Sequence, residues 1–151
     1  MQKYMQKLII FLIIFFNFGN LFSNEKYFLT LRNEKVNLRQ GPSFDYPVKI
    51  FYKKKFLPVL VQDRSENFRK VRDHENNTGW IHISQLSKKK AAIVIDDKLI
   101  LFNSPTIYSN PLAILKKGRL VKIKKCKNDW CKVITGDFNG WVKKESLWGL
   151  L

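Results

Sequence analysis

The feature that most constrains this chain is an internal repeat with a period of about sixty-two residues. Three matched pairs of segments carry the repeat, at offsets of 63, 62 and 61 residues: Pro42 with Pro105, Phe68–Val71 with Trp130–Val133, and Gly79–Ile81 with Gly140–Val142. Offsets that slip by one residue are typical of small loop insertions between repeated units. The sequence therefore predicts two similar units in tandem.

The first residues are expected to lie outside both units. Lys3 and Lys7 precede an unbroken apolar run over residues 8–16, a pattern typical of a secretory signal peptide. The run is shorter than the roughly 20 apolar residues that span a bilayer. We predict a signal peptide over residues 1–23, with cleavage after Ser23, and a periplasmic or secreted protein with no transmembrane domain after cleavage. An uncleaved N-terminal anchor is the alternative, because the cleavage site lacks an Ala-x-Ala box.

Two units of residues 24–87 and 88–151 account for the rest of the chain. Each is close to the lower size limit for a self-sufficient hydrophobic core. The link between them, Ser87–Lys90, is short and contains neither glycine nor proline. A tether this short predicts that the two units pack against each other.

The chain is strongly basic, with a formal net charge of +16 and a pI near 10.0. The leader holds two lysines and no acidic residue, so its removal lowers the net charge to +14. A basic chain commonly binds nucleic acid, but export disfavours that partner. Anionic envelope polymers or membrane surfaces are the partners expected instead. The alternative is that a base-composition bias of the genome enriched lysine without any binding role.

The chain has two cysteines, Cys126 and Cys131, which flank a tight-turn sequence between two alternating apolar runs. Facing positions at the end of a hairpin come within disulfide distance, and an exported protein favours the oxidised form. We therefore predict a disulfide that stabilises the fold by about 2 kcal/mol. A reactive thiol or a metal pair is the rival interpretation, but both histidines lie in the other unit. We expect no metal and no cofactor.

Both units are predicted to be all-β with little helix. Short alternating runs are separated by turns every eight to twelve residues, and Val36 and Leu38 alternate with polar neighbours. The segment 41–47 holds one glycine and two prolines, which predicts a loop. The second unit repeats this plan.

The first unit carries the motif residues of a known family. They are Val36–Arg39, Gly41–Pro42, Asp45–Pro47, Gly79–His82 and Leu86–Ser87. This pattern resembles the bacterial SH3-like (Src homology 3-like) domain, in its exported, tandem variety, and the resemblance extends from Phe28 to about Trp148. It implies two small, strongly bent β-barrels and a non-catalytic module that binds cell-wall peptides or glycans.

The chain departs from that family pattern at several positions. The family favours glycine at the turn that Phe56 occupies, as Gly118 does in the second unit. A bulky residue is costly wherever φ is positive, so we expect a different turn geometry at Phe56. Phe102 replaces Arg39 in the second unit, which predicts that the second barrel does not use this segment as the first does.

We expect no enzyme activity, because two barrels leave no segment for a catalytic domain and no nucleophile lies in a recognisable base motif. Binding is expected at the loops that rim the first barrel. Three side chains would supply flat apolar contact and three would supply polarity: Phe44, Tyr46 and Trp80, with Arg39, Asp45 and His82. Tyr46 is the strongest single candidate. Alternatively, Trp80 and its equivalent Trp141 hold the barrel cores together, and Arg39 pairs with Asp45.

Three functions remain open at this stage. The first is a binding module for peptidoglycan or another anionic envelope polymer. The second is a subunit that binds a peptide of an envelope protein or pairs through its sheet edges. The third is nucleic-acid binding through the lysine clusters at Lys53–Lys55, at Lys88–Lys90 and between Lys116 and Lys127. It requires that the leader fail to export the protein.

Overall fold

A computed structural model of the chain describes residues 25–151. The predicted signal peptide, residues 1–23, lies outside the described residues. The described part is all-β, as the alternating runs predicted, with two single-turn 3-10 helices. The first unit contains β1 (Tyr27–Leu31), β2 (Val36–Arg39), β3 (Val48–Tyr52), β4 (Pro58–Ser65), β5 (Phe68–Arg72), β6 (Thr78–His82), η1 (Ile83–Gln85) and β7 (Leu86–Ser87). The second contains β8 (Ala91–Val94), β9 (Lys98–Phe102), β10 (Pro111–Lys116), β11 (Leu120–Lys127), β12 (Trp130–Thr135), β13 (Phe138–Lys143), η2 (Lys144–Ser146) and β14 (Leu147–Trp148).

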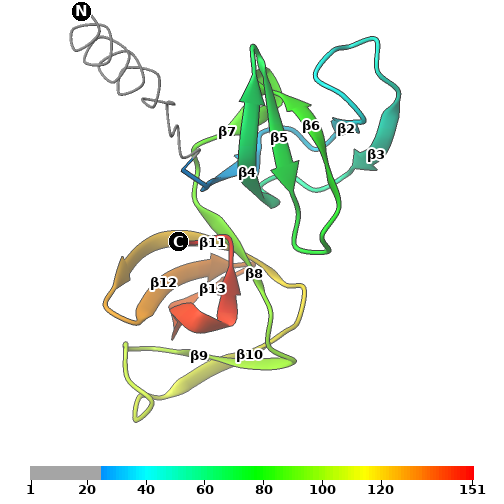
Figure 1. The fold of residues 1–151 in the computed structure, drawn as a ribbon. Helices are drawn as coiled ribbons and strands as arrows, with labels where there is room; N and C mark the ends of the chain where they lie inside the picture. Colours follow the sequence, from blue (N-terminus) through cyan, green and yellow to red (C-terminus); the bar gives the residue numbers. More distant parts are fainter. Residues whose placement is uncertain (1–24) are drawn as a thin grey trace, which may run out of the picture.

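The two units have the same topology. The first sheet has the strand order β3-β2-β6-β5-β4-β1-β7, and the second has the order β10-β9-β13-β12-β11-β8-β14. Each strand of the second sheet therefore occupies the same position in the strand order as its repeat equivalent in the first sheet. Figure 1 shows each sheet bent around its own centre to form a small barrel. The prediction of two tandem β-barrels is confirmed.

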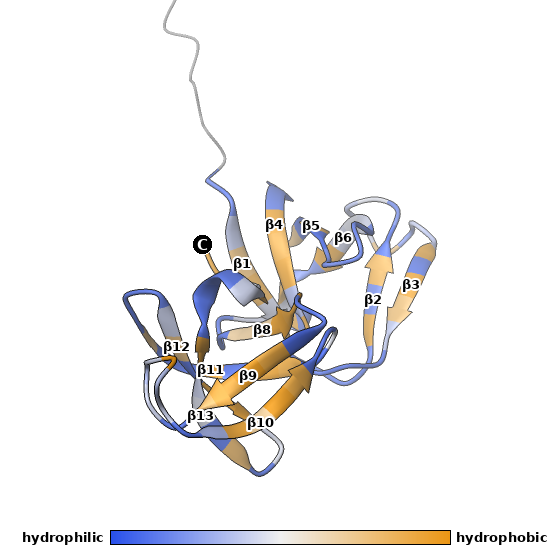
Figure 2. Cartoon of the chain, turned by 90° about the horizontal axis from the view of Figure 1, so that it is seen from below, coloured by the Kyte–Doolittle hydropathy of each residue, from blue (hydrophilic) through white to orange (hydrophobic). Residues whose placement is uncertain are grey.

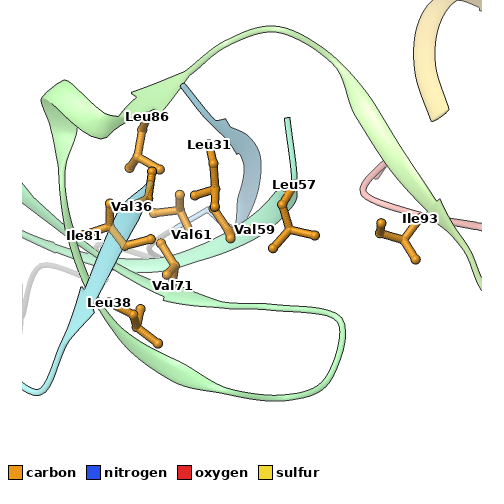
Figure 3. Close-up of a cluster of buried hydrophobic side chains, with 10 residues drawn as sticks. All are labelled: Leu31, Val36, Leu38, Leu57, Val59, Val61, Val71, Ile81, Leu86 and Ile93. Atoms are coloured by element: carbon orange, nitrogen blue, oxygen red, sulfur yellow. The ribbon is translucent and has the colours of Figure 1, made fainter. Parts of the chain in front are cut away.

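Each barrel encloses its own core, built from the alternate residues of its strands. Val36 and Leu38 of β2 are buried, whereas Asn37 and Arg39 between them are partly exposed. The first core also contains Leu31, Leu57, Val59, Val61, Val71, Ile81 and Leu86 (Figure 3). The second contains Ala92, Val94, Leu99, Leu101, Leu115, Val121, Cys131, Val133, Val142 and Leu147. The strand period of two therefore separates an apolar inner face from an outer face that is free to diverge.

The two barrels pack against each other through the outer face of the strands around β8. Ile93 of β8 is almost completely buried and belongs to the core cluster of the first barrel (Figure 3). Leu120 of β11 also packs on that cluster, and the ring of Trp148 lies edge-on to Phe28 at 4.9 Å. The equivalent positions of the first barrel hold Thr30, Pro58 and Ser87. The prediction that the short tether holds the barrels together is confirmed, and an apolar patch specific to the second barrel mediates the contact.

The turn before β4 has a positive φ at Phe56, as its equivalent in the second barrel has at Gly118. Phe56 has a φ of +65°, and Gly118 at the equivalent place has a φ of +80°. The Phe56 N–H donates to the Leu31 carbonyl at 2.9 Å, and the Gly118 N–H donates to the Val94 carbonyl at 2.8 Å. The two turns are therefore the same, and the prediction of a different geometry at Phe56 was wrong.

The physical reason lies in the Phe56 ring. Its centroid is 4.8 Å from the Nζ of Lys122 and 5.6 Å from that of Lys89, and Lys55 approaches it to 5.4 Å. Ammonium groups over an aromatic ring are attracted by its quadrupole. The left-handed backbone places the ring at the junction of the barrels, where these contacts offset the cost of positive φ.

A buried carboxylate organises the turn between β5 and β6. Asp73 accepts hydrogen bonds from the Tyr52 hydroxyl at 2.8 Å and from the Asn77 side-chain amide at 2.9 Å. The backbone N–H groups of Glu75 and Asn77 donate to its other oxygen at 2.9 and 2.8 Å. Burial of the Tyr52 hydroxyl, and then its hydrogen bond to Asp73, raise the pKa of Tyr52 well above its usual range. This network connects β3 to the β5–β6 turn.

The disulfide prediction is confirmed. Cys126 and Cys131 are directly opposed in the register of β11 and β12 and form a disulfide. Asn128 in the intervening turn has a φ of +52°, a conformation that asparagine tolerates better than most residues. Cys131 is fully buried and belongs to the second core, whereas Cys126 is exposed, so the bond joins the exposed side of the hairpin tip to the core.

Candidate functional site

The loop between β2 and β3 closes over an aromatic cluster at one end of the first barrel. Phe68 begins β5 and His82 ends β6, and the register places the two residues directly opposite each other. Phe44 reaches them from the loop. The ring centroids of Phe44, Phe68 and His82 are separated by 5.1–5.2 Å. We call these three residues together with Arg39 the first-barrel cluster.

The cluster offers a flat apolar surface to solvent. Phe68 is 6% exposed and forms its floor, whereas Phe44 is 61% exposed. Phe44 meets Phe68 at an interplanar angle of 67°, an edge-on geometry that aromatic rings favour. An exposed aromatic ring that rests on a buried one is held in place before any ligand arrives, which lowers the entropy lost on binding.

Arg39 fastens the loop to the barrel. Its Nη1 donates to the carbonyls of Phe44 and Tyr46 at 3.0 and 2.8 Å, and its guanidinium lies 5.3 Å from the Phe44 ring centroid. The suggested pairing of Arg39 with Asp45 was wrong, because the Asp45 carboxylate accepts from the Ser43 hydroxyl at 2.8 Å. Arg39 uses one nitrogen for both loop contacts, so Nη2 and Nε can donate to a ligand.

Tyr46 lies at the far side of the same loop. A Cβ built on Gly41 would come within 2.6 Å of the Tyr46 ring, so the ring lies directly on the Gly41 backbone. This close approach explains why glycine occupies position 41. About half of the Tyr46 side chain remains exposed beside the cluster.

His82 presents one ring nitrogen to solvent. Its Nδ1 accepts the Ser84 N–H at 3.3 Å, which caps the 3-10 helix η1, and lies 2.7 Å from the Ser84 hydroxyl. Because Nδ1 accepts from a backbone donor, the hydrogen-bond network assigns the proton of the neutral ring to Nε2. The ring therefore offers an N–H donor next to Phe44.

Trp80 and Trp141 lie on the outer faces of their sheets. Trp80 follows Gly79 and precedes Ile81, both of which face the core, and it pairs with Arg39 across β2 and β6. Trp80 keeps part of its surface exposed. Trp141 is buried, as expected for a structural residue, with the Lys125 ammonium 5.8 Å from its ring.

The six predicted residues thus divide into three groups. Arg39, Phe44 and His82 meet in the first-barrel cluster, and Tyr46 adjoins it through Arg39. Trp80 is a strand neighbour of Arg39. The Asp45 side chain is engaged within the loop and contributes no contact to the cluster.

The sequence predicts Phe68 only as a strand residue, and the structure adds it to the candidate site. Its equivalent is Trp130, and an aromatic residue at both repeat positions was the available signal. In the second barrel Phe102 and Trp130 meet at 5.7 Å, and the Lys143 ammonium lies 5.0 Å from the Trp130 ring. The second barrel therefore carries an aromatic–cation cluster of its own, with the cation on the strand that holds His82 in the first.

The family assignment rests on the two repeats. The family model of the bacterial SH3 domain matches residues 32–88 and again residues 96–149, which together exceed half of the chain. The chain belongs to the bacterial SH3 domain family. The resemblance inferred from the motif residues is confirmed.

The chain is also similar to parts of three larger proteins of known structure. The chain is similar to NlpC2 from Trichomonas vaginalis (11% identity, TM-score 0.38), covering 82% of this chain and 48% of that one. It is similar to NlpC1 from the same organism (11%, 0.37), covering 82% and 45%. It is also similar to an NlpC/P60 family protein from Bacillus cereus (12%, 0.38), covering 80% and 55%. The chain therefore spans about half the length of each.

The comparison with curated proteins found no match. Within residues 25–151, none of the helical segments has the length and hydropathy that a membrane span requires.

Proposed function

We propose that the protein is an exported, non-catalytic binding module whose first barrel binds peptidoglycan, or another envelope polymer or peptide, at the first-barrel cluster. The observation that carries the proposal is the exposed Phe44 ring, which contacts Arg39, Phe68 and His82. Flat rings recognise the apolar faces of sugars and peptide side chains.

The polar groups beside the ring suit an anionic peptide or polymer. Among the described residues, no hydrogen-bond acceptor is used by Nη2 or Nε of Arg39 or by the Nε2–H of His82. These three groups can therefore donate to a ligand. An arginine fork matches a carboxylate with two parallel hydrogen bonds. The net charge of +14 on residues 24–151 would attract an anionic polymer at long range.

The disulfide and the family support an envelope location. Disulfides persist in oxidising compartments and are rare in the cytosol. Together with the predicted leader, the Cys126–Cys131 bond favours a periplasmic or secreted protein.

Co-sedimentation of residues 24–151 with purified sacculi tests the proposal. We expect Phe44→Ala to weaken binding about tenfold, because aromatic anchors of this kind contribute on the order of 1.5 kcal/mol. Phe51→Ala is the matched control, since Phe51 is an exposed phenylalanine of the same barrel outside the cluster. Soluble wall fragments should compete, and about 0.5 M salt should weaken binding without abolishing it.

Two results would contradict the proposal. The first is an absence of sedimentation at low salt. The second is equal loss of binding for the Phe44 and Phe51 variants. A specific cross-link to an envelope protein that survives wall digestion and is lost in Phe44→Ala would instead favour the second candidate, an interaction subunit that binds an extended peptide.

A further inference from the structure

The outer face of the second barrel carries a set of lysines that pair with no acidic residue across the strands, although Asp129 and Glu145 lie near Lys143 at one end. Residues that pair across antiparallel strands, and residues two apart on one strand, point to the same side of a sheet. The register of β9 to β13 thereby places on one side Lys122, whose ammonium lies over the Phe56 ring, and six further lysines: Lys98, Lys116, Lys125, Lys127, Lys132 and Lys143. No acidic residue occupies a paired position on this side of these strands. Asp97, which precedes β9, lies 4.0 Å from Lys117, outside the set.

Aromatic rings alternate with these lysines. Trp130, which is partly exposed, pairs with Lys127 on one side and Lys143 on the other. The buried Trp141 pairs with Lys132 and has the Lys125 ammonium 5.8 Å from its ring. The Phe102 ring lies 5.7 Å from Trp130. We call this surface, from Lys98 and Lys116 across to Lys125 and Lys127, the lysine–aromatic face.

Exposed aliphatic side chains continue the face at its edge. Ile100 of β9 and Ile114 of the edge strand β10 are directly opposed, and they are 42% and 64% exposed. The equivalent pair of the first barrel is Asn37 and Phe51. Figure 2 shows β9 and β10 as largely hydrophobic strands, and Figure 1 shows their hairpin at the end of the second barrel away from the first.

The loop after β9 adds Tyr108, which is 91% exposed, and Ile107. The loop is ordered by its own hydrogen bonds, because the Ser104 N–H donates to the Ser109 hydroxyl at 2.9 Å and the Tyr108 N–H to the Thr106 hydroxyl at 3.3 Å. The exposed side chains are therefore presented on a structured support.

We propose that the lysine–aromatic face docks the protein on an anionic lipid bilayer. The exposed pair Ile100 and Ile114, with the pair Lys98 and Lys116 beside it, is complementary to both layers of such a surface, since the aliphatic side chains enter the interface and the ammonium groups meet anionic headgroups. A free polyanion would use the lysines but would leave Ile100 and Ile114 without a role. A second copy of the chain would place six lysines against six others, which opposes association. This function goes beyond wall binding and uses the other barrel.

The test is co-sedimentation of residues 24–151, which contain every strand of both barrels, with lipid vesicles. We expect binding to vesicles of phosphatidylcholine mixed with phosphatidylglycerol and much weaker binding to phosphatidylcholine alone. Lys98→Gln with Lys116→Gln should lower the partition coefficient by up to about 25-fold, since each lysine near an anionic surface contributes about fivefold. Ile100→Asn with Ile114→Asn should lower it at least about tenfold.

Phe51→Asn is the matched control, because Phe51 occupies the position of Ile114 in the first barrel. It should leave vesicle binding unchanged, and circular dichroism with the unfolding midpoint should show that each variant is folded. If the isoleucine variant does not fold, the lysine variant still decides the matter. Phe44→Ala should bind vesicles as the unmodified chain does, which separates this proposal from the wall-binding one.

Four outcomes would overturn the inference. Three are no sedimentation with phosphatidylglycerol vesicles at low salt, equal binding of the isoleucine variant and the Phe51 control, and retention by soluble polyphosphate with none by vesicles. A concentration-dependent dimer that the isoleucine variant abolishes would also overturn it, in favour of a second copy.

Discussion

Replacing Phe56 with glycine changes the free energy of unfolding in two opposite ways. It relieves backbone strain, and it removes side-chain contacts at the junction of the barrels. The φ of +65° costs a non-glycine residue about 1–2 kcal/mol. Glycine would remove that strain but would lose about 0.5–1 kcal/mol through its greater freedom in the unfolded chain. The backbone alone therefore predicts that Phe56→Gly stabilises the protein by roughly 0.5–1 kcal/mol.

The ring contributes more than the backbone costs. Full burial of a phenylalanine side chain contributes about 1.5–3 kcal/mol, and Phe56 is partly exposed, so roughly 1–2 kcal/mol is lost with the ring. The ammonium groups of Lys122, Lys89 and Lys55 all lie within 6 Å of the ring centroid, and each contact at an exposed site contributes about 0.5 kcal/mol. Loss of both terms outweighs the relief of strain, so we expect a net destabilisation of about 1.5–3 kcal/mol.

Urea unfolding of residues 24–151 measures this change. The reverse substitution, Gly118→Phe, should cost about 0.5–1 kcal/mol, the same net backbone difference, because no atom lies within 4 Å of a Cβ built there and the ring would gain no contact. A double-mutant cycle of Phe56→Gly with Lys122→Ala should give a coupling of about 0.5 kcal/mol. The reasoning fails if Phe56→Gly raises the free energy of unfolding or if the cycle shows no coupling.

Two further predictions concern other contacts of the fold. Because the pKa of Tyr52 is raised in the folded protein, the unfolded chain releases the phenolic proton at a lower pH, and the free energy of unfolding should fall as pH rises above about 10. Tyr52→Phe should remove this part of the pH dependence in unfolding titrations. An unchanged slope of stability against pH would argue against the buried hydroxyl. Trp148→Ala should lower the free energy of unfolding by about 2 kcal/mol, because it removes the edge-on contact with Phe28. The two barrels should then unfold in two separate transitions. A single transition at the original midpoint would show that this contact does not couple the barrels.

The fold could be predicted because its two strongest signals are local and repeated. Alternation in segments such as Val36–Arg39 separates an inner from an outer face without any knowledge of the partner strands. The repeat then doubles the evidence for every strand, since an element must fit both copies. The cysteine pair was predictable for the same reason, because the two residues face each other across one hairpin.

Contacts between distant segments could not be predicted in the same way. The Arg39 side chain donates to two loop carbonyls instead of pairing with the Asp45 carboxylate. The register of β2 with β3 determines which loop atoms lie within its reach. Phe56 kept the turn geometry of Gly118 because lysines from outside its own turn meet its ring. Such contacts depend on how sheets close and how barrels pack, which the spacing of residues along the chain does not encode.

The same division explains why the candidate site was predicted only in part. The loops after β2 and β9 have the same backbone closure, but Tyr46 lies on Gly41 in the first, whereas Ser104 and Ser109 form a hydrogen bond in the second. Gly41 and Tyr46 of the first loop correspond to Ser104 and Ser109 of the second. The first pair holds its loop by packing a ring on the backbone, and the second pair holds its loop by a hydrogen bond. Backbone equivalence therefore predicts where the loop lies and says nothing of what it presents to solvent. Because the side chains have diverged while the backbone has not, the two barrels are expected to bind different partners, and variants of one should leave the binding of the other intact.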